Sequence, residues 1–453
     1  MEYRNKRFMI LGLKKTGLST IRFLKTINTL KIYTTDQNLK IDLSDTTYIE
    51  YDEAINYLDK IDYLVKSPGI PYDIPILEKA HVLNIPIIND IEIAYHYIEK
   101  NKKIIGITGS NGKTTTTTIL ERLLREANIK ALSVGNIGKP LLDALQEDNN
   151  EVDVYVLELS SFQLLDIHEF NADINIFLNI TSAHLDYHHT FDHYLNAKLN
   201  LIKNLHSDSI IIYNLDDEIL NTCLSDVNAH KYTFSLINPE ANIYIDDDMI
   251  IYNKEQIMNV HDIKLLGKHN LYNIMPCIIV GKLLNVDNKV IRSAITNFVG
   301  LPHRLEHVKT INNISFYNDS KSTNVASTLS ALASFNQAVI LLLGGYDRGQ
   351  EFEEIIKHKN TKLVIAFGAT KDRIKMIAEK ENKICLACES IEETVKVAYR
   401  LAKSNDIILF SPASASWDEF PDYEVRGDYF KRIVNNLPNN TNLEDAYECK
   451  GDK

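Results

Sequence analysis

Short apolar runs alternate with longer amphipathic segments along most of the chain. Within residues 1–97, the apolar runs Phe8–Gly12, Ile32–Thr35 and Tyr63–Val65 end in Gly, Asp or Ser-Pro-Gly turns, and a helical pattern begins near Gly17. Apolar runs joined by turns and helices predict parallel strands with helical crossovers. This region is therefore predicted to be a doubly wound, Rossmann-like α/β sheet.

The same alternation continues in two further units. We place their boundaries at 98–300 and 301–453, which gives three domains of ordinary size for a chain of 453 residues. Their expected strands are Lys103–Thr108, Val152–Leu159, Ile174–Ile180 and Ile210–Asn214, then Ile314–Tyr317, Val339–Leu343, Leu363–Phe367 and Ile407–Phe410. Ligands of open α/β sheets gather at the carboxyl ends of the strands, so chemistry is expected in the turns that follow them.

Charge and cysteine content narrow the possible partners. The net charge is -12 without a long Lys/Arg cluster, so nucleic acid is not an expected partner. No apolar run reaches the ~18 residues of a membrane span, and no signal segment is visible, so no membrane insertion is expected. The five cysteines are scattered, which favours a reducing, cytoplasmic location. The polar tail from about Asn436 is expected to fray.

Two groups of residues could suggest a zinc site, but neither has the ligand spacing of one. Cys385 and Cys388 form a lone C-x-x-C pair without further ligands, so packing at a strand end is the better interpretation. His188, His189 and His193 lie in a segment with no H-E-x-x-H pattern and no cysteine, and we expect surface or packing roles for them.

A glycine-rich turn between a predicted strand and a predicted helix carries the strongest chemical signal. It reads GITGSNGKTT from Gly106, and Lys113-Thr114 directly follow its last glycine. Such a turn offers backbone N–H groups to phosphates, with the lysine near the β/γ-phosphates and the hydroxyl on Mg²⁺. Gly106 lies one position too early for a strict P-loop, and an ordinary turn is the alternative. The predicted ATP-binding residues are Gly109, Ser110, Asn111, Gly112, Lys113, Thr114 and Thr115. This predicts a P-loop-type ATPase α/β domain in the centre of the chain.

Two further side chains end neighbouring strand candidates of the same unit. Glu158 closes the run Val152–Leu159, and His184 follows the run Ile174–Ile180. A carboxylate that attacks a phosphate needs cations to offset the repulsion. We therefore predict that Glu158 and His184 bind metal, although helix capping would be favoured for Glu158 alone.

Taken in order, these motifs resemble those of the Mur ligase family over nearly the whole chain. The matching motifs are Gly12 with Thr16-Gly17-Leu18-Ser19, Ser67-Pro68-Gly69, TGSNGKTT, Gly135-Asn136-Ile137-Gly138, the segment Glu158–Leu164, Gly267–Asn270 with Asn273, Leu301–Arg304, Asp319–Asn324 and Ser411–Ser416. The resemblance implies a cytoplasmic enzyme of peptidoglycan precursor synthesis.

 The enzyme is expected to be a monomer that joins D-glutamate to UDP-N-acetylmuramoyl-L-alanine through an acyl phosphate, using ATP and two Mg²⁺ ions.

The resemblance also implies roles for single residues. Lys113, His184 and Lys198 would be catalytic, and the metal ligands would be Thr114, Glu158, His184 and a carbamylated Lys198. Without the resemblance, Lys198 would be taken for a surface helix lysine. ATP contacts are implied at Asn270, Asn273, Arg304 and Asp319, and substrate contacts at Lys15, Thr16, Asp36, Ser67, Gly69, Asn136, Ser161, His303, Lys321, Thr323, Ser416 and Tyr423.

Some positions depart from the patterns, and two other functions stay open. Lys14 stands where the dinucleotide fingerprint needs glycine, which argues against NAD. Arg348 replaces a common lysine, and Pro276 suits a helix that starts there. Another amide ligase, of the Mur or folylpolyglutamate type, is the nearest alternative. A nucleotide-binding regulator without chemistry is the other, although it would not need two metal sites.

Overall fold

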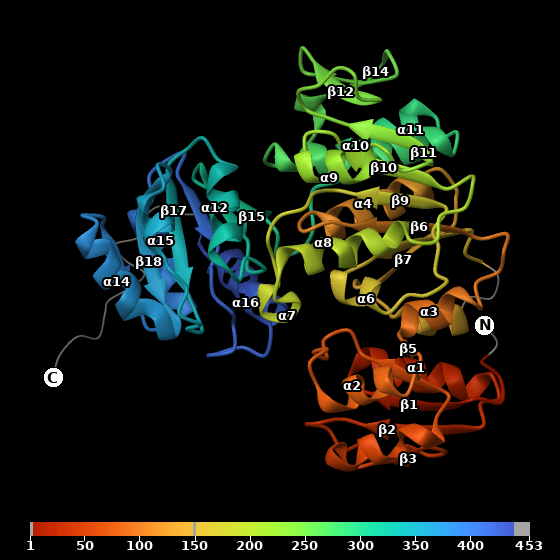
Figure 1. The fold of residues 1–453 in the computed structure, drawn as a ribbon. Coiled ribbons are helices and arrows are strands. Elements are labelled where there is room, and N and C mark those ends of the chain that lie inside the picture. Colours follow the sequence, from red (N-terminus) through yellow and green to blue (C-terminus); the bar gives the residue numbers. More distant parts are fainter. Residues whose placement is uncertain (1–2, 148–150, 439–453) are drawn as a thin grey trace. The chain divides into compact units, whose positions relative to one another are not determined.

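The computed structural model describes residues 3–147 and 151–438, so the polar tail predicted from about Asn436 lies, from residue 439 onward, outside the described residues. The chain forms two compact units. Unit 1 contains Met1–Ile263 and Leu271–Asn297, and unit 2 contains Lys264–Asn270 and Phe298–Lys453. The described residues form three β-sheets with helices, two sheets in unit 1 and one in unit 2 (Figure 1). The mixed α/β class is confirmed, and the three domain boundaries stay predictions.

The first sheet of unit 1 is parallel throughout and has the strand order β3-β2-β1-β4-β5. Its strands are β1 (Arg7–Leu11), β2 (Lys31–Thr35), β3 (Thr47–Tyr48), β4 (Tyr63–Lys66) and β5 (Ile87–Ile88). Alternate residues of β1 enter different cores, Phe8 and Ile10 on one face and Met9 and Leu11 on the other. Helices therefore cover both faces of this sheet, as the sequence pattern predicts.

The second sheet of unit 1 has the order β14-β13-β12-β11-β10-β9-β6-β8-β7. Its strands are β6 (Lys103–Thr108), β7 (Ala131–Gly135), β8 (Val154–Glu158), β9 (Ile174–Phe177), β10 (Ile210–Asn214), β11 (His230–Phe234), β12 (Ile243–Asp246), β13 (Met249–Tyr252) and β14 (Glu255–Asn259). The strands β7 to β12 pair in parallel, and β12, β13 and β14 form an antiparallel extension. The central strand β6 therefore lies between β8 and β9.

The sheet of unit 2 has the order β15-β16-β20-β17-β18-β19. Its strands are β15 (Glu306–Ile311), β16 (Ile314–Asn318), β17 (Val339–Gly344), β18 (Thr361–Phe367), β19 (Cys385–Ala387) and β20 (Ile407–Phe410). Only β15 is antiparallel to its neighbour among these described strands. The β17 side chains alternate between two cores, with Ile340 and Leu342 on one face and Leu341 and Leu343 on the other.

The helices of the described residues connect these strands. In unit 1 they are α1 (Lys15–Thr26), η1 (Tyr51–Lys60), α2 (Pro75–Val82), α3 (Asp90–Tyr95), α4 (Lys113–Glu126), α5 (Leu141–Glu147), α6 (Ser161–Leu165), α7 (Leu185–His188), α8 (Phe191–Leu199), η2 (Asn200–Ile202), α9 (Glu218–Leu224), η3 (Val260–Asp262) and α11 (Asn288–Thr296). In unit 2 they are α12 (Val325–Ala333), α13 (Glu353–Lys357), η4 (Gly368–Thr370), α14 (Lys371–Lys380), α15 (Ile391–Leu401) and α16 (Tyr423–Asn435).

The helix around Pro276 differs from its prediction. The helix α10 (His269–Leu283) begins well before this residue, so Pro276 lies in its interior and not in its first turn. A proline there removes one backbone hydrogen bond and strains the preceding turn. Burial offsets that cost, because the flanking Met275 and Cys277 are fully buried and the Cys277 thiol donates to the carbonyl of Thr116.

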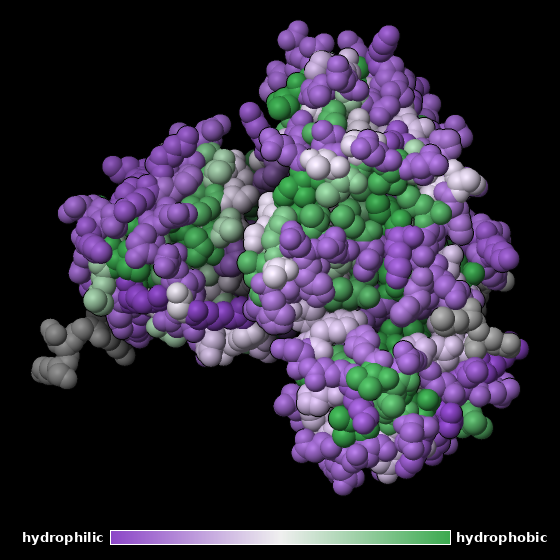
Figure 2. Space-filling view, in the orientation of Figure 1, coloured by the Kyte–Doolittle hydropathy of each residue, from purple (hydrophilic) through white to green (hydrophobic). Residues whose placement is uncertain are grey.

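Polar residues cover much of the face drawn in Figure 2, and hydrophobic residues gather over parts of the sheets between them. Among the helices of residues 3–147 and 151–438, none has both the length and the apolar composition that a membrane span requires. The same ranges contain no group of three or more His, Cys, Asp or Glu side chains placed to hold a metal ion. Cys385 and Cys388 pack in different cores, which matches a packing role.

Candidate active site

The glycine-rich turn joins the end of β6 to the start of α4, in the middle of the second sheet. The register pairs Ile107 with Glu158 of β8, and Thr108 with Phe177 of β9. Because parallel strands end at the same edge, the turn, Glu158 and the segment after β9 come together there. The structure thus brings together three segments that the sequence analysis identified separately.

Gly112 shows why this turn needs glycine at its last position. Its φ is 86°, in the left-handed region, and it caps the N-terminus of α4. A Cβ atom there would lie 2.1 Å from Oδ1 of Asn273, so no other residue fits without a shift. Asn273, a predicted ATP-binding residue, therefore packs directly against the turn. The first N–H groups of α4 have no partner within the helix and point toward the turn.

The turn is held from both sides by side chains that the sequence analysis missed. The Asn111 N–H donates to Oδ1 of Asn179 at 2.9 Å, and the Asn179 amide donates back to the Asn111 carbonyl at 3.1 Å. The Ser110 hydroxyl contacts the Tyr194 hydroxyl at 2.7 Å and the Thr181 carbonyl at 2.9 Å. The only sequence sign for Asn179 and Thr181 was their place at the end of an apolar run, and Tyr194, on α8, had none. Each of the three lies far along the chain from the turn that it contacts.

Lys113 lies over the turn that it follows. Its ammonium donates to the carbonyls of Gly109 at 2.6 Å and Ser110 at 3.0 Å. Thr114 and Thr115 occupy the first turn of α4. A positive charge beside a glycine-rich turn at the N-terminus of a helix favours the binding of a polyanion.

Glu158 is a buried carboxylate with one oxygen in use. It is the last residue of β8 and 3 % exposed, and its Oε1 accepts from the Asn136 amide at 2.9 Å. Among the residues that the structure describes, no hydrogen-bond partner reaches its Oε2. An acidic oxygen left buried without a donor is costly, unless a cation binds it. The residues present therefore fit a hard divalent ion, and Asn136 orients its ligand.

Lys198 is buried, which excludes the surface alternative. It lies on α8 and is 1 % exposed, and its ammonium donates to the Gly109 carbonyl at 2.9 Å. Burial lowers the pKa of Lys198 well below its usual value, and the charge of Lys113 adds to this lowering. The side chain thus points at the glycine-rich turn. Forming its neutral amine costs less free energy than for a lysine in solvent.

His184 stands before α7 with a left-handed φ of 54°. Its ring packs against Phe162 with centroids 5.0 Å apart. Burial lowers the pKa of His184, and the neighbouring charges of Lys113 and Lys198 add to this lowering. A neutral imidazole is the form that binds metals.

The first sheet supplies a second group of predicted contacts. Gly12 has a φ of 97°, and the Ser67 hydroxyl donates to its carbonyl at 3.2 Å. The Lys15 ammonium donates to the carbonyl of Gly138, two residues beyond Asn136. Asp36 accepts three backbone N–H groups, from Leu13 at 2.7 Å, Asn38 at 2.8 Å and Leu39 at 2.9 Å. Burial would raise the pKa of Asp36, but these donors hold it below its usual value.

Three more predicted substrate residues lie in unit 1. Thr16 is in the first turn of α1, and Gly69 has open space where a Cβ atom would be. Ser161 begins α6, and its hydroxyl contacts Nε2 of the buried His188 at 3.0 Å. His188 was expected to be a surface or packing residue, and the structure gives it a packing position with one polar contact.

In unit 2, predicted residues gather at the edge where β16, β20 and β17 end. Asn318 pairs with Phe410, and Leu342 pairs with Phe410 on the other side. Asp319 directly follows β16, and its Oδ2 accepts from the Ser411 hydroxyl at 2.7 Å. Its Oδ1 accepts from the Leu305 N–H at 3.2 Å. Burial raises the pKa of Asp319 to about 6.

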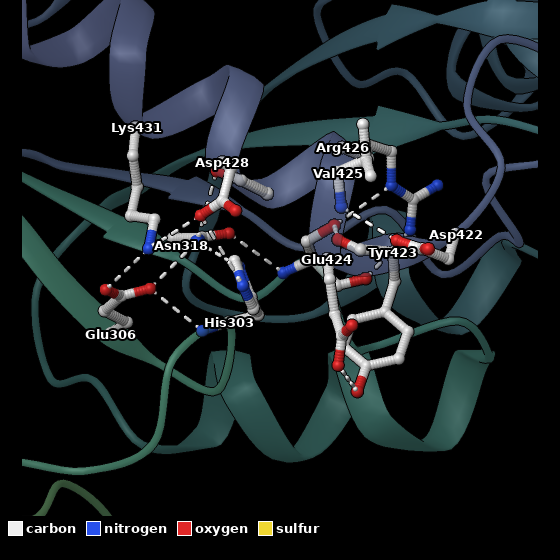
Figure 3. Close-up of polar contacts among 12 residues, drawn as sticks. His303, Glu306, Asn318, Asp422, Tyr423, Glu424, Val425, Arg426, Asp428 and Lys431 are labelled. Atoms are coloured by element: carbon white, nitrogen blue, oxygen red, sulfur yellow. Dashed lines mark hydrogen bonds and ion pairs between the residues drawn. The ribbon is translucent and has the colours of Figure 1, made fainter.

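Figure 3 shows how the side chains of this edge are connected. The Asn318 amide donates to Nδ1 of His303 and to Oε2 of Glu306, both at 3.0 Å. Nδ1 of His303 is therefore an acceptor, and the ring is held by protein groups. On the same edge, the Lys321 ammonium donates to the Tyr423 hydroxyl at 2.9 Å.

Arg426 connects two predicted segments of this edge, and the sequence analysis missed it. The side chain is 1 % exposed, and its Nη2 and Nε donate to the Ser320 carbonyl at 2.8 Å and hydroxyl at 3.1 Å. Its Nη1 donates to the Ser414 carbonyl at 3.0 Å. The turn with Asp319 and Lys321 is thereby fixed to the turn that ends in the buried Ser416.

The remaining predicted residues of unit 2 make fewer described side-chain contacts. The Asn270 amide donates to the Leu266 carbonyl at 2.7 Å. Arg304 lies close enough to Asp319 for its charge to favour the ionised carboxylate. Thr323 is half-buried just before α12. Their roles in ligand binding stay predictions.

The second sheet and its glycine-rich turn define an α/β protein that binds a nucleoside polyphosphate. Sequence profiles agree: "Mur ligase MurD-like, N-terminal domain" matches residues 6–89, "Mur ligase middle domain" matches 107–281, and "Mur ligase, glutamate ligase domain" matches 303–414. The chain belongs to the Mur ligase family.

Relatives match over almost their entire length. A UDP-N-acetylmuramoylalanine–D-glutamate ligase of Geobacillus sp. (strain WCH70) is 39% identical over 450 residues, 96% of this chain and 98% of the relative. The enzyme of the same name from Bacillus cereus (strain G9842) is 38% identical over 447 residues, 96% and 99% of the two chains. The solved structure of UDP-N-acetylmuramate-alanine ligase MurC from Thermotoga maritima shares the fold, with a TM-score of 0.59, 17% identity and 95% and 99% of the chains covered.

Proposed function

We propose that this chain joins D-glutamate to UDP-N-acetylmuramoyl-L-alanine at the expense of ATP, a step of peptidoglycan precursor synthesis. The observation that carries the proposal is full-length similarity to relatives named for this reaction, at 39% identity over 96% of the chain. The site supports it, because the glycine-rich turn, Lys113 and Glu158 meet at one edge of the second sheet. An acyl transfer driven by ATP needs a polyphosphate site beside a cation site.

In the proposed reaction, the alanyl carboxylate of the UDP-linked substrate attacks the γ-phosphorus of ATP. An acyl phosphate forms, and ADP is the leaving group. The amine of D-glutamate then attacks the acyl carbon, the tetrahedral intermediate loses its proton and collapses, and phosphate departs. Lys113 and the N–H groups of the turn hold the phosphates and stabilise the charge that develops on them.

Mur ligases use ATP and Mg²⁺, and the proposed ligands here are Thr114, Glu158, His184 and a carbamylated Lys198. Bound magnesium supplies charge that offsets the repulsion between carboxylate and phosphate. The free Oε2 of Glu158 supports one position. Carbamylation needs a neutral amine to attack CO₂, forming an N–C bond and releasing a proton. The lowered pKa of the buried Lys198 supports that step, and a carbamate offers the hard oxygens that magnesium prefers.

The other predicted contacts are proposed as follows. Lys15, Thr16, Asp36, Ser67, Gly69, Asn136 and Ser161 serve the UDP-linked substrate, and Asn270, Asn273, Arg304 and Asp319 serve ATP. His303, Lys321, Thr323, Ser416 and Tyr423 serve D-glutamate. For His303 we propose an indirect role, because its ring is held by Asn318. We further propose that the chain is a monomer and that it lies in the cytoplasm. The cytoplasmic location agrees with the unpaired cysteines Cys223, Cys277, Cys385 and Cys388.

Product formation with a panel of amino acids tests the proposed function. The purified chain, with ATP, Mg²⁺ and UDP-N-acetylmuramoyl-L-alanine, is expected to release ADP with D-glutamate and not with L-glutamate, L-lysine or diaminopimelate. Release with another amino acid would favour a different amide ligase of the family. Release that needs neither co-substrate would contradict a ligase.

A further inference from the structure

A buried ion pair in unit 1 joins the first sheet to the second, and the proposed mechanism does not use it. Lys66 ends β4, Asp166 follows α6, and their side chains are 0 % and 1 % exposed. The distance from Nζ to Oδ2 is 3.2 Å.

Protein groups surround this ammonium. In addition to its ion pair with Asp166, Lys66 Nζ donates to the Ile70 carbonyl at 3.3 Å and to the Tyr187 hydroxyl at 3.1 Å. The Tyr187 hydroxyl donates in turn to the Ile70 carbonyl at 2.9 Å, and the Tyr72 hydroxyl donates to Oδ1 of Asp166. We call Lys66, Tyr72, Asp166 and Tyr187 the buried cluster.

Stability does not account for the buried cluster. Removing two charges from water costs more than their attraction returns in many proteins, and apolar replacements are often at least as stable. The same balance is visible here, because burial lowers the pKa of Lys66 and raises the pKa of Asp166 to about 6, despite the opposite charge beside each. What such a pair supplies is a defined geometry between the segments that carry it.

The segments that carry the buried cluster are those of the proposed substrate site. Lys66 directly precedes Ser67, and Ile70 directly follows Gly69. Asp166 closes α6, which Ser161 begins, and Tyr187 lies in α7, one turn after His184. Phe162 packs on Tyr187 with centroids 4.5 Å apart and on His184 at 5.0 Å.

We infer that Lys66, Asp166 and Tyr187 are positioning residues, which fix the segment Ser67–Ile70 of the first sheet against Ser161 and His184 of the second. This inference rests on the proposed function. The buried cluster sets the distance between the part of the site that holds the UDP moiety and the part where the carboxylate reacts. A displacement of about 1 Å between such parts can cost up to a hundredfold in rate.

The test is the double variant Lys66→Met/Asp166→Asn, which removes both charges. The new side chains are similar in size to the original ones, and the amide keeps one oxygen acceptor at position 166. We expect a melting temperature close to that of the wild type, and a KM for UDP-N-acetylmuramoyl-L-alanine raised about tenfold. The KM values for ATP and D-glutamate are expected to stay within about twofold, since a general loss of structure would raise all three. An unchanged KM for the UDP-linked substrate in this folded variant would overturn the inference.

Two further variants keep the test decisive. Tyr187→Phe removes one hydroxyl and keeps the ring against Phe162, and we expect the same KM to rise about threefold by loss of the two hydrogen bonds that this hydroxyl makes with Lys66 and Ile70; no rise overturns the inference even if the double variant does not fold. As matched control, Arg7→Gln/Asp62→Asn removes a partly exposed pair of the first sheet, 3.0 Å apart, and should change no KM. A wild type that forms no product refutes the proposed function instead, which separates the two failures.

Discussion

Two buried carboxylates occupy the same kind of position in different sheets, and their surroundings differ. Glu158 ends β8 in unit 1, and Asp319 follows β16 in unit 2. Oε2 of Glu158 has no hydrogen-bond partner within residues 3–147 and 151–438, whereas Oδ1 of Asp319 accepts from the Leu305 N–H and Oδ2 from the Ser411 hydroxyl. The sheet edge at Glu158, which we call the open edge, keeps an acceptor available for a cation. The sheet edge at Asp319, which we call the closed edge, uses its acceptors to hold two turns together.

The largest expected effect comes from removing the charge at the open edge. Glu158→Gln keeps an oxygen for the Asn136 amide but no longer offers an anionic ligand. We expect kcat to fall by about 10³-fold, equivalent to about 4 kcal/mol, as for the loss of one strong transition-state contact. The measurement is ADP release over a Mg²⁺ titration, with Glu126→Gln on α4, an exposed partner of Arg122, as control. Turnover near that of the control would mean that the free oxygen binds no metal.

Local features of this open edge could be predicted from the sequence. The glycine-rich turn follows an apolar run and precedes Lys113-Thr114, so spacing alone indicates a phosphate site. Glu158 could be placed beside it because parallel strands end at one edge. The strand bounds were nearly correct, although β8 and β9 are shorter than their apolar runs.

Contacts between distant segments could not be predicted. Arg426 bonds Ser320 across 106 positions, and Lys198 bonds Gly109 across 89. Their side chains are of types that usually lie in solvent, so only the folded chain shows that they are buried. Pro276 shows the opposite error, because a local rule placed a helix start where tertiary packing continues the helix.

A second prediction addresses the geometry of the open edge. Gly112→Ala forces a side chain into a left-handed position with φ 86° and against Oδ1 of Asn273. We expect ATP binding to weaken by about 3 kcal/mol, from backbone strain and displacement of the turn. Calorimetry with ATP measures it. Gly349→Ala is the control for strain alone, since Gly349 has φ 77° and no atom near its Cβ position. Equal, small effects of both changes would contradict the role of Asn273.

A third prediction concerns the closed edge of unit 2. Arg426→Lys keeps the charge but loses the planar fork that reaches Ser320 and Ser414 together. At least one buried carbonyl loses its donor, so we expect a loss of about 2 kcal/mol in stability and a raised KM for D-glutamate. Thermal unfolding and initial rates measure both. Arg432→Lys, an exposed position on the same helix α16, should leave both unchanged.

The smallest effect concerns the charge of Asp319 itself. Burial raises its folded-state pKa to about 6, above the usual 3.8, so the folded chain binds the proton more tightly than the unfolded chain. Its contribution to stability therefore increases as pH falls from 7 to 5, by about 1 kcal/mol. Asp319→Asn has no carboxyl group to titrate, so the stability of the wild type relative to this variant should increase from pH 7 to pH 5. Melting temperatures of both chains at pH 5, 6 and 7 measure the difference.

Asp428→Asn provides the matched control for this pH dependence. Asp428 is 66% exposed at its side chain, and the hydrogen bond from Lys431 lowers its pKa. A lowered pKa places its stability change below pH 4, so the difference between wild type and this variant should stay flat from pH 7 to 5. If the stability difference between wild type and the Asp319 variant stayed equally flat, the Asp319 carboxylate would be ionised in the folded chain over this whole pH range. The hydrogen-bond donors around Asp319 would then be enough to stabilise its charge, and the two carboxylates would differ only in the oxygen that Glu158 offers to a cation.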